Sequence, residues 1–439
     1  MSLKYILKKS IFSERVKLIE IRNNLYENII CPKKIQKIQI DNFNFIWKKA
    51  VNEIPFYTYW KQKHNISKEI KSINELQDFP YLKKKHIVNY QYLIFKKINK
   101  KRSVSTGGSS GEPTKFPSSK VDFLSIYSDA YVARGWFGID PFDKILSFWG
   151  HSHLFGFGLG GRIREIKRKI MDYIINTNRL NAYDMHPNSI IKYYNVALKF
   201  KPKMISGYTS CIFKLAQFII ENNLEGTISD ELKVVIPTSE TISVTEKKII
   251  EKAFRVPVAI EYGMAETGII AHSNIWNDDL FVFWNSFVCN ASNENVLILS
   301  TLYNKLFPLI NYYTEDVIKP GKSIGTSLIS FKSISGRSRE EFKLRTINNG
   351  LILISGILIV HILKSFDNIY SVQAKQLKKK SIEVYITSNI QINIREIKIY
   401  FIKQLNIHHK NIDETCIKII QVKKSKKSVA GKETIVWGK

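Results

Sequence analysis

The sequence predicts an α/β fold built on a parallel sheet, followed by a smaller α+β unit. Two stretches of the chain alternate apolar runs of strand length with amphipathic helices, which is typical of parallel sheets. In the clearer stretch, "LKVVIP" (232–237) precedes a helix that starts at Ser243, and "VPVAI" (256–260) follows it. Upstream, "PKMIS" precedes a helical pattern over 210–223. Both stretches have the order expected of β-α-β units.

The helix between the two clearer strands has a defined start and one apolar face. Ser243 and Glu246 have the spacing of a capping box, which satisfies backbone N–H groups at a helix start. Four apolar residues fall on one face of this helix: Ile249, Ile250, Ala253 and Phe254.

Polar segments follow three of the predicted strands. They are 207–210, 238–241 and "EYGMAETG" (261–268). If the strands are parallel, the three segments meet at one edge of the sheet, where open α/β folds bind ligands. A ligand site is therefore expected at this edge.

A second unit begins near residue 340. After about Asn295 the pattern changes to short strands, and "SGRSREE" forms a polar boundary. Beyond it, strands are expected around "LILISGILIVHIL" and "SIEVYITS", with a helix near "IREIKIYFIKQL" and a strand at "CIKIIQV". The apolar segment 350–363 is too short to span a bilayer, and we expect two buried strands around a glycine turn. The predicted domains are 1–339 and 340–439.

Composition limits the classes of function. The 439 residues, 44% hydrophobic and 12% aromatic, predict a globular chain of two or more domains. The net charge of +29 is spread along the chain rather than gathered in one stripe, which argues against a nucleic-acid partner. Contact with an anionic membrane surface or an acidic polysaccharide stays open.

The four cysteines are far apart in sequence, which indicates neither a zinc site nor disulfides and favours a reducing, cytoplasmic compartment. The N-terminus lacks a signal-peptide pattern, and no transmembrane segment is expected.

Two glycine-rich segments are candidates for phosphate contacts. "TGGSSGEPT" (106–114) has glycines and hydroxyl residues that suit a backbone cradle for an anion, although a flexible surface linker is the alternative. It is not a Walker loop, because Glu112 follows Gly111. "GFGLGG" matches G-x-G-x-x-G at Gly156, Gly158 and Gly161, but six residues separate it from the strand "ILSFW". We therefore interpret it as a loop rather than a dinucleotide site.

Taken in order, the motifs resemble those of the adenylate-forming superfamily, specifically its phenylacetate-coenzyme A ligase-like branch, which includes capsule-biosynthesis proteins. The likeness runs from about residue 45 to the C-terminus. "AVNEIPFYTYWKQ" and "LQDFPYLKKKHI" resemble N-terminal segments of that branch. The resemblance implies a large α/β adenylation domain with a small β-subdomain, followed by a mobile α+β lid domain.

The resemblance also implies roles for residues in the N-terminal motifs. The loop 106–114 would hold the β- and γ-phosphates of ATP, although Glu112 stands where lysine is common. Tyr262 would stack on adenine and Glu266 would bind Mg²⁺. The full set implied to bind the nucleotide is Thr106, Gly107, Gly108, Ser109, Ser110, Gly111, Thr114, Ser239, Glu240, Glu261, Tyr262, Gly263, Asp316 and Arg337.

Three later motifs complete the resemblance. "NYYTED" resembles the segment usually written Tyr-Arg-Thr-Gly-Asp, so Asp316 would bind ribose, while Tyr313 and Glu315 replace Arg and Gly. "SGRSREE" resembles the hinge motif, with Arg337 as its arginine. "VAGKETIVWGK" resembles the C-terminal Gly-Lys motif, which makes Lys432 the catalytic lysine together with Glu266 as the metal ligand.

The implied function is ATP- and Mg²⁺-dependent conversion of a carboxylic acid to an acyl adenylate, with release of pyrophosphate. The acyl group would pass to coenzyme A, or to an amine or hydroxyl acceptor in surface (capsule or O-antigen) polysaccharide assembly. The alternatives are a phenylacetate-type aromatic acid-coenzyme A ligase, a catalytically silent binding protein on the same fold, and a basic nucleic-acid or membrane-surface binder. The acyl pocket is expected to include His151, Gly207, Tyr208, Met264 and Gly268.

Overall fold

The computed structural model describes residues 3–98, 103–105, 114–149, 159–182, 187–240, 242–337 and 341–355, and between 359 and 425 all but 360–361, 364–365, 367, 370, 379, 389, 409–410 and 424. The chain opens with helices: α1 (Leu3–Asn28), α2 (Pro32–Glu53), α3 (Pro55–Lys63), η1 (Ile73–Asp78), α4 (Lys84–Asn89) and α5 (Gln91–Ile94). Pro55 begins α3 directly after α2 ends, because proline suits the first turn of a helix.

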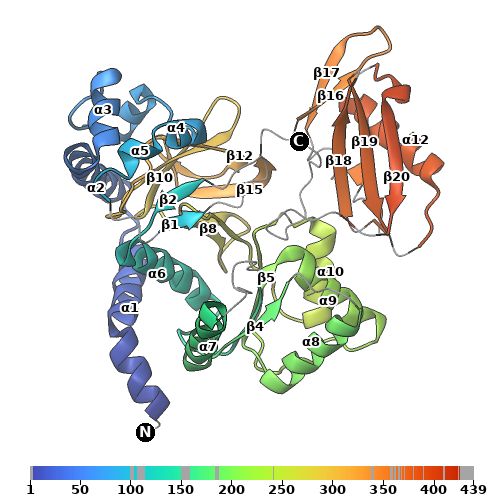
Figure 1. The fold of residues 1–439 in the computed structure, drawn as a ribbon, viewed down its shortest axis with the longest axis horizontal. Helices are drawn as coiled ribbons and strands as arrows, with labels where there is room; N and C mark the ends of the chain where they lie inside the picture. The colour runs from blue at the N-terminus through green and yellow to red at the C-terminus, as the bar shows by residue number, and fades with distance from the viewer. Residues whose placement is uncertain are drawn as a thin grey trace.

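A four-stranded parallel sheet lies in the middle of the chain (Figure 1). Its strands are β3 (Ile145–Trp149), β4 (Thr177–Asn181), β5 (Met204–Tyr208) and β6 (Val234–Thr238), in the order β4-β3-β5-β6. The helices along this part of the chain are α7 (Leu159–Ile174), α8 (Pro187–Phe200), α9 (Thr209–Glu221) and α10 (Val244–Phe254). The predicted parallel sheet is confirmed, and so is the capping box at the start of α10.

The predicted strand over 256–260 is wrong. Only Val258 forms a bridge, a single parallel pairing with Val235 of β6. Pro257 has no N–H group, so it accepts from Val235 N at 3.1 Å but cannot donate to a ladder. This segment then leads into a second sheet.

The second sheet is antiparallel and has seven strands. They are β7 (Glu261–Met264), β8 (Gly268–Ser273), β9 (Leu280–Val282), β10 (Phe287–Ala291), β11 (Val296–Thr301), β12 (Tyr312–Pro320) and β15 (Ser330–Arg337), in the order β10-β11-β12-β15-β9-β8-β7. The third polar segment, 261–268, therefore lies in this sheet and not in the parallel one. Helix α6 (Lys120–Trp136) packs against β8, and α1 packs against α6. Two short hairpins complete this part: β1 (Ser103–Ser105) with β2 (Lys115–Pro117), and β13 (Ser323–Ile324) with β14 (Ser327–Leu328).

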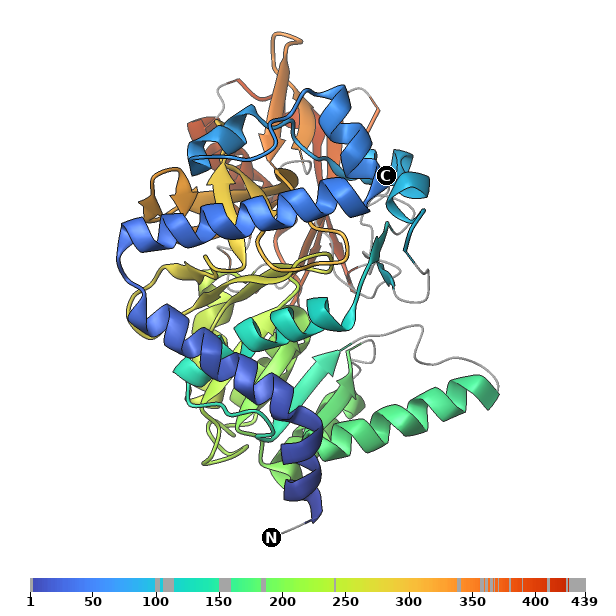
Figure 2. The same ribbon diagram turned by 90° about the vertical axis from the view of Figure 1, so that its left-hand side faces the viewer.

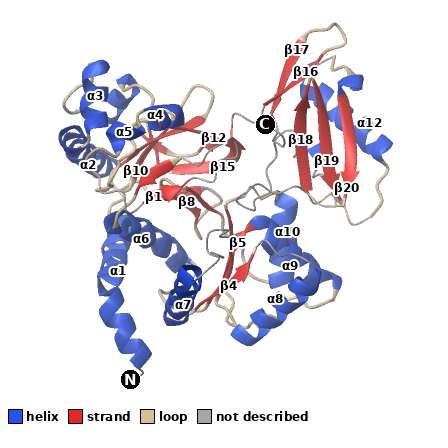
Figure 3. Ribbon diagram, in the orientation of Figure 1, coloured by secondary structure: helices blue, strands red, loops and turns tan. Residues whose placement is uncertain are grey.

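The C-terminal unit has its own core, made of residues between Phe342 and Ile419. It contains the hairpin β16 (Glu341–Arg345) and β17 (Leu351–Ser355), the sheet β18 (Ser371–Leu377), β19 (Ser381–Thr387) and β20 (Ile417–Val422), the helix α12 (Ile394–His408) and the turn η3 (Glu414–Cys416). Figure 3 shows α12 beside this sheet. The second strand expected in 350–363 is wrong, because Ile359, Ile362 and Leu363 are helical. Periodicity alone does not separate a short buried strand from a buried helical turn.

No helix in the described part of the chain is both long enough and apolar enough to cross a membrane. The four cysteines are free thiols.

Candidate active site

The carboxyl ends of β5 and β6 are joined by hydrogen bonds of Glu240. Its carboxylate accepts from the backbone N–H of Ser210 at 2.7 Å and from the Ser210 hydroxyl at 3.2 Å. The Thr209 hydroxyl donates to the Glu240 backbone carbonyl at 3.1 Å. Since Thr209 and Ser210 form the first turn of α9, the carboxylate occupies the positive end of that helix. Ser239, predicted to contact adenine, lies between the last residue of β6 and Glu240; its side chain is exposed and its φ is 69°.

Two predicted pocket residues on β5 are held by packing with β3. Gly207 has φ of 140°, and a Cβ at this position would lie 2.1 Å from the backbone oxygen of Phe148. Tyr208 is buried, and its ring lies 5.4 Å from that of Trp149. Both residues therefore set the close approach of β5 and β3 beneath the strand ends.

The segment 261–268 reaches the same place from the other sheet. The Thr238 hydroxyl at the end of β6 donates to the Glu261 backbone carbonyl at 3.4 Å. The β7–β8 turn is tight: Met264 N donates to the Thr267 hydroxyl at 3.2 Å, and Gly268 has φ of 71° with the side chain of Ile126 close beneath it. The three predicted polar segments are thus brought together, although across two sheets.

Tyr262 and Asp316, the residues expected at adenine and ribose, form a hydrogen-bonded pair. They are 54 residues apart in sequence, and the Tyr262 hydroxyl donates to Asp316 Oδ2 at 2.8 Å. Burial, and then the negative charge of Asp316, raise the pKa of Tyr262 well above its ordinary value. The phenol therefore keeps its proton and remains a donor at neutral pH.

Glu266, expected to bind magnesium, forms a second pair of this kind. Its carboxylate is buried and accepts from the Tyr312 hydroxyl at 3.0 Å. Burial, and then Glu266, raise the pKa of Tyr312. The ammonium of Lys305 is also buried, lies 3.6 Å from Asp122, and is close enough to Glu266 to interact with its charge. Burial lowers the pKa of Lys305, and Asp122 opposes that shift.

Glu261 is committed to a different set of contacts from its neighbour Tyr262. Its carboxylate accepts from Arg134 of α6 at 3.2 Å, and both side chains are largely buried. The strand partner of Glu261 on β8 is His272, whose ring is fully buried and whose pKa is lowered by that burial. Adjacent strand residues point to opposite faces of a sheet, so Glu261 supports β7 while Tyr262 faces Asp316.

The segment that resembles Tyr-Arg-Thr-Gly-Asp keeps an unusual backbone. Glu315, at the position of the glycine, has φ of 72°. Tyr313, at the position of the arginine, has the ammonium of Lys83 5.0 Å from its ring centre. Leu82 pairs with Tyr312, so the segment "LQDFPYLKKKHI" lies along the start of β12.

Four residues of this region were not among the predicted site residues: Lys83, Tyr312, Lys305 and Arg134. Tyr312 was within reach, because it is the first tyrosine of "NYYTED" and shares a strand with Asp316. Lys83 belongs to the segment "LQDFPYLKKKHI", which resembled the family without indicating a site role, and nothing in the local sequence of Arg134 marks it.

Several predicted residues lie outside the described part of the structure. They are Thr106, Gly107, Gly108, Ser109, Ser110, Gly111, His151 and Lys432, and the side chain of Arg337 is also not described. Thr114 is described and buried, next to β2. Because β1 pairs with β2 at Ser105 and Lys115, the glycine-rich segment connects two paired strands.

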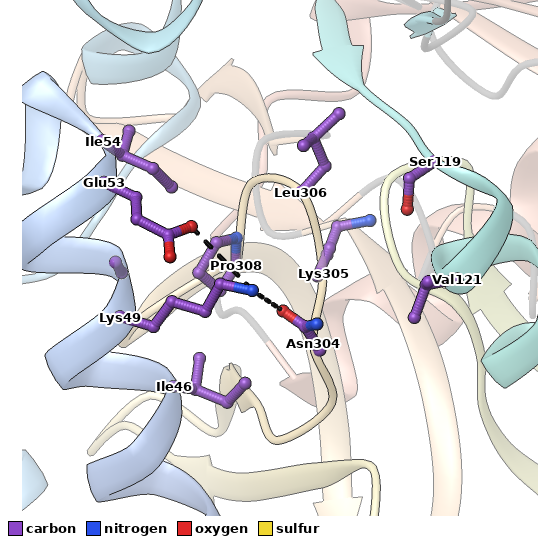
Figure 4. Close-up of a pocket in the computed structure, with 11 residues that line it drawn as sticks. Ile46, Lys49, Glu53, Ile54, Ser119, Val121, Asn304, Lys305, Leu306 and Pro308 are labelled. Atoms are coloured by element: carbon purple, nitrogen blue, oxygen red, sulfur yellow. Dashed lines mark hydrogen bonds and ion pairs between the residues drawn. The ribbon is translucent and has the colours of Figure 1, made fainter. Parts of the chain in front are cut away.

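A cavity of about 230 Å³ is lined by none of Tyr262, Asp316, Glu266 and Tyr312, but Lys305 borders it (Figure 4). It is lined by α2, by the segment 304–308 and by Ser119 and Val121. Lys49, which contacts Asn304 at 2.8 Å, crosses it. None of the described residues predicted for the acyl pocket lines this cavity.

Glu266 offers one buried carboxylate, a ligand of the kind that fits a magnesium ion bound jointly with a nucleotide. Mg²⁺ prefers oxygen ligands and is commonly held by one or two carboxylates together with substrate phosphates. Among the described residues, no group of three or more His, Cys, Asp or Glu side chains could hold a metal alone. A magnesium ion here would therefore depend on the phosphates for most of its ligands.

Comparisons with known proteins agree on the fold. No family model matches the chain. The protein CapK of Staphylococcus aureus is 26% identical over 345 residues, covering 75% of this chain and 71% of CapK. The structure of 2-hydroxyisobutyryl-CoA ligase in the postadenylation state, with 2-HIB-AMP, has a TM-score of 0.69 at 15% identity and covers 92% of this chain and 89% of the ligase. The same ligase in the thioesterification state has a TM-score of 0.59 at 14% identity, covering 93% and 90%.

An ATP-bound RpMatB-BxBclM chimera has a TM-score of 0.51 at 12% identity, covering 75% of this chain and 65% of the chimera. The predicted fold of adenylate-forming acyl-CoA ligases is therefore confirmed. These matches bear out, at the level of the fold, the resemblance to the adenylate-forming superfamily that the motifs indicated.

Proposed function

We propose that the protein is an adenylate-forming ligase that activates a carboxylic acid with ATP. The observation that carries this proposal is the hydrogen bond between Tyr262 and Asp316, the two residues expected at adenine and ribose. They come from two strands, β7 and β12, of a fold shared with acyl-CoA ligases, and the hydrogen bond from Thr238 to Glu261 joins β7 to the end of β6. Glu266, the expected metal ligand, lies on the turn that follows Tyr262.

In the proposed reaction, a carboxylate oxygen of the acid attacks the α-phosphorus of ATP. A bond forms between the acyl oxygen and this phosphorus, the bond to the β,γ-diphosphate breaks, and pyrophosphate leaves. Both reactants are anions, so the residues act mainly by positioning and by neutralising charge. Asp316 would accept from the ribose hydroxyls, and Tyr262 would orient Asp316 through its hydroxyl.

Mg²⁺, when bound, would supply positive charge at the phosphates. Glu266 is the residue proposed to hold it. The Tyr312 hydroxyl would fix one carboxylate oxygen of Glu266, and the buried ammonium of Lys305 would lie close to it. These contacts keep the ligand in one orientation before the nucleotide arrives.

We propose the division into domains 1–339 and 340–439, with Lys432 on the second. The seven-stranded sheet ends at Arg337, the hairpin of the C-terminal unit starts at Glu341, and that unit has a separate core. A cation carried on such a unit can approach the reacting carboxylate and then withdraw, which avoids permanent burial of an unpaired charge. The TM-score to the postadenylation state of 2-hydroxyisobutyryl-CoA ligase is higher than the TM-score to its thioesterification state, which supports a second domain arranged as in the postadenylation state.

The acceptor that we propose is an amine or hydroxyl group in surface-polysaccharide assembly, a setting supported by the similarity to CapK. Coenzyme A is the second candidate, and the likeness to 2-hydroxyisobutyryl-CoA ligase favours it. In either case the nucleophile attacks the acyl carbon, a new thioester, amide or ester bond forms, and AMP leaves with the bonding electrons.

The testing experiment measures pyrophosphate release with ATP and Mg²⁺ across aromatic acids, short fatty acids, amino acids and uronic acids, with hydroxylamine to trap adenylates. Acid-dependent release is expected. Glu266→Gln should abolish it at all Mg²⁺ concentrations, and Lys432→Ala should abolish adenylate formation while sparing transfer from a supplied acyl adenylate.

Two outcomes would contradict the proposal. If the unmodified protein does not bind ATP, the alternative of a catalytically silent protein on the same fold is favoured. Unchanged adenylation in Glu266→Gln would refute the metal assignment. Supplying the adenylate with coenzyme A or with amino sugars separates the two acceptor classes.

A further inference from the structure

Helix α7 exposes an apolar stripe to solvent. Ile166, Ile170 and Tyr173 are 57%, 56% and 71% exposed, and Met171 is 45% exposed. The first three are spaced i, i+4 and i+7, so they lie on one side of the helix. Clustered exposed apolar side chains of this size mark an interaction surface, unlike single scattered ones.

The polar side of α7 is the side that faces the protein. Asp172 is buried, and both of its carboxylate oxygens lie 3.0 Å from Nε of Arg179 on β4. A residue two positions from Ile170 lies about 200° around the helix from it, so Asp172 and the apolar stripe are on opposite sides. Crossover helices of parallel sheets normally turn their apolar side inward. In the part of α7 whose side chains are described, 166–174, that orientation is reversed, and Figure 2 shows the helix extending away from the rest of the chain.

The apolar stripe has basic neighbours. Lys167 and Lys169 are both exposed and lie on either side of it. In sequence, α7 carries five Lys and Arg residues against two acidic ones, and one of the acidic residues, Asp172, is paired with Arg179. Lysines beside an apolar stripe can extend their charged ends toward lipid phosphates while their stems stay with the apolar side chains.

We propose that α7 binds the surface of an anionic lipid membrane, with Ile166, Ile170 and Tyr173 inserted below the headgroups. Each basic residue near such a surface is attracted to anionic lipids, and the net charge of +29 adds a long-range attraction. A second copy of the chain fits less well, because a symmetric contact through this stripe would bring the lysines of the two helices together. The binding is independent of the adenylation reaction.

The test is co-sedimentation of the full chain with vesicles of phosphatidylcholine alone or with about one third phosphatidylglycerol, at low and high salt. The chain should pellet with the anionic vesicles and be released by salt, since exposed charges are screened. Ile166→Ser with Ile170→Ser should lower the bound-to-free ratio at least about tenfold, because two half-exposed isoleucines no longer enter the apolar layer. Lys167→Gln with Lys169→Gln should weaken binding to anionic vesicles only.

Matched controls lie on α12. Ile399, 62% exposed, is changed to serine, and Lys398 and Lys403 are changed to glutamine, with no loss expected in either variant. Equal loss in the α12 and α7 variants would overturn the assignment to α7. Failure of the chain to bind anionic vesicles would also overturn the proposal. A dimer in solution that Ile166→Ser with Ile170→Ser converts to monomers, with vesicle binding unchanged, would assign the stripe to a second copy and refute the proposal.

Discussion

The change Tyr262→Phe tests the central pair of the proposed site. It removes the hydroxyl that donates to Asp316 at 2.8 Å and leaves the ring in place. A hydrogen bond to a charged acceptor contributes about 1.5–3 kcal/mol, and we use the lower end because the pair is only partly buried. If the hydroxyl orients Asp316 toward ribose, the loss should appear in ATP affinity as a decrease of about tenfold.

The assay is direct titration of the chain with ATP and Mg²⁺ in the absence of an acid, followed by KM for ATP in pyrophosphate release. Tyr57→Phe is the matched control, since Tyr57 is a buried tyrosine that donates to the carbonyl of Pro308. It should lower the melting temperature while leaving ATP affinity unchanged. The double variant with Asp316→Asn completes a thermodynamic cycle. If the effects of the two single changes on ATP affinity add to within about 0.5 kcal/mol, the residues are not coupled and the reasoning is refuted.

Three further changes test the scaffold around the site. Asp129→Ala removes the carboxylate that pairs with the buried Arg22, which should cost about 3–5 kcal/mol and lower the melting temperature by more than about 5 °C; a smaller shift would contradict the buried ion pair. Gly207→Ala places a Cβ against the Phe148 carbonyl and should reduce the yield of folded protein, whereas normal yield and stability would refute the close strand contact. Burial lowers the pKa of His272 below the ordinary value of 6.5. As the pH falls through 6.5, the unfolded chain therefore binds a proton at His272 before the folded chain does. Stability should therefore fall as pH drops from 7 to 5, less steeply in His272→Gln, and an unchanged slope would contradict this origin.

The parallel sheet was predictable because its signals are local. Strand-length runs, the capping box of Ser243 and Glu246, and the amphipathic pattern of α10 all act within a few residues of chain. Val256–Ile260 has the same composition as a strand, but its place is decided by Pro257 and by the transfer of the chain into the second sheet. Such decisions depend on tertiary pairing, which composition does not carry.

The sequence was enough to predict which segments at strand ends form the site. It was not enough to predict which side chains of those segments contact one another. Glu240 is an example: its motif suggested adenine, while its carboxylate binds the first turn of α9. Glu261 likewise belongs to an ion pair with Arg134, and a sequence motif does not say which face of β7 each residue takes. The motif locates the residue in the chain, and the sheet register decides what the side chain meets.

The departures at Tyr313 and Glu315 bear on whether the proposed site is still active. A glycine at position 315 would adopt a positive φ without strain, and Glu315 holds φ of 72° at a cost of about 1 kcal/mol. The backbone form is therefore kept although the glycine is lost, and Asp316 still reaches Tyr262. Lys83 places a cation over the ring of Tyr313, where the resembling motif has an arginine. The hydrogen bond to Asp316 and the cation beside Tyr313 are therefore both present despite the two departures, which favours the proposed nucleotide site over the silent alternative.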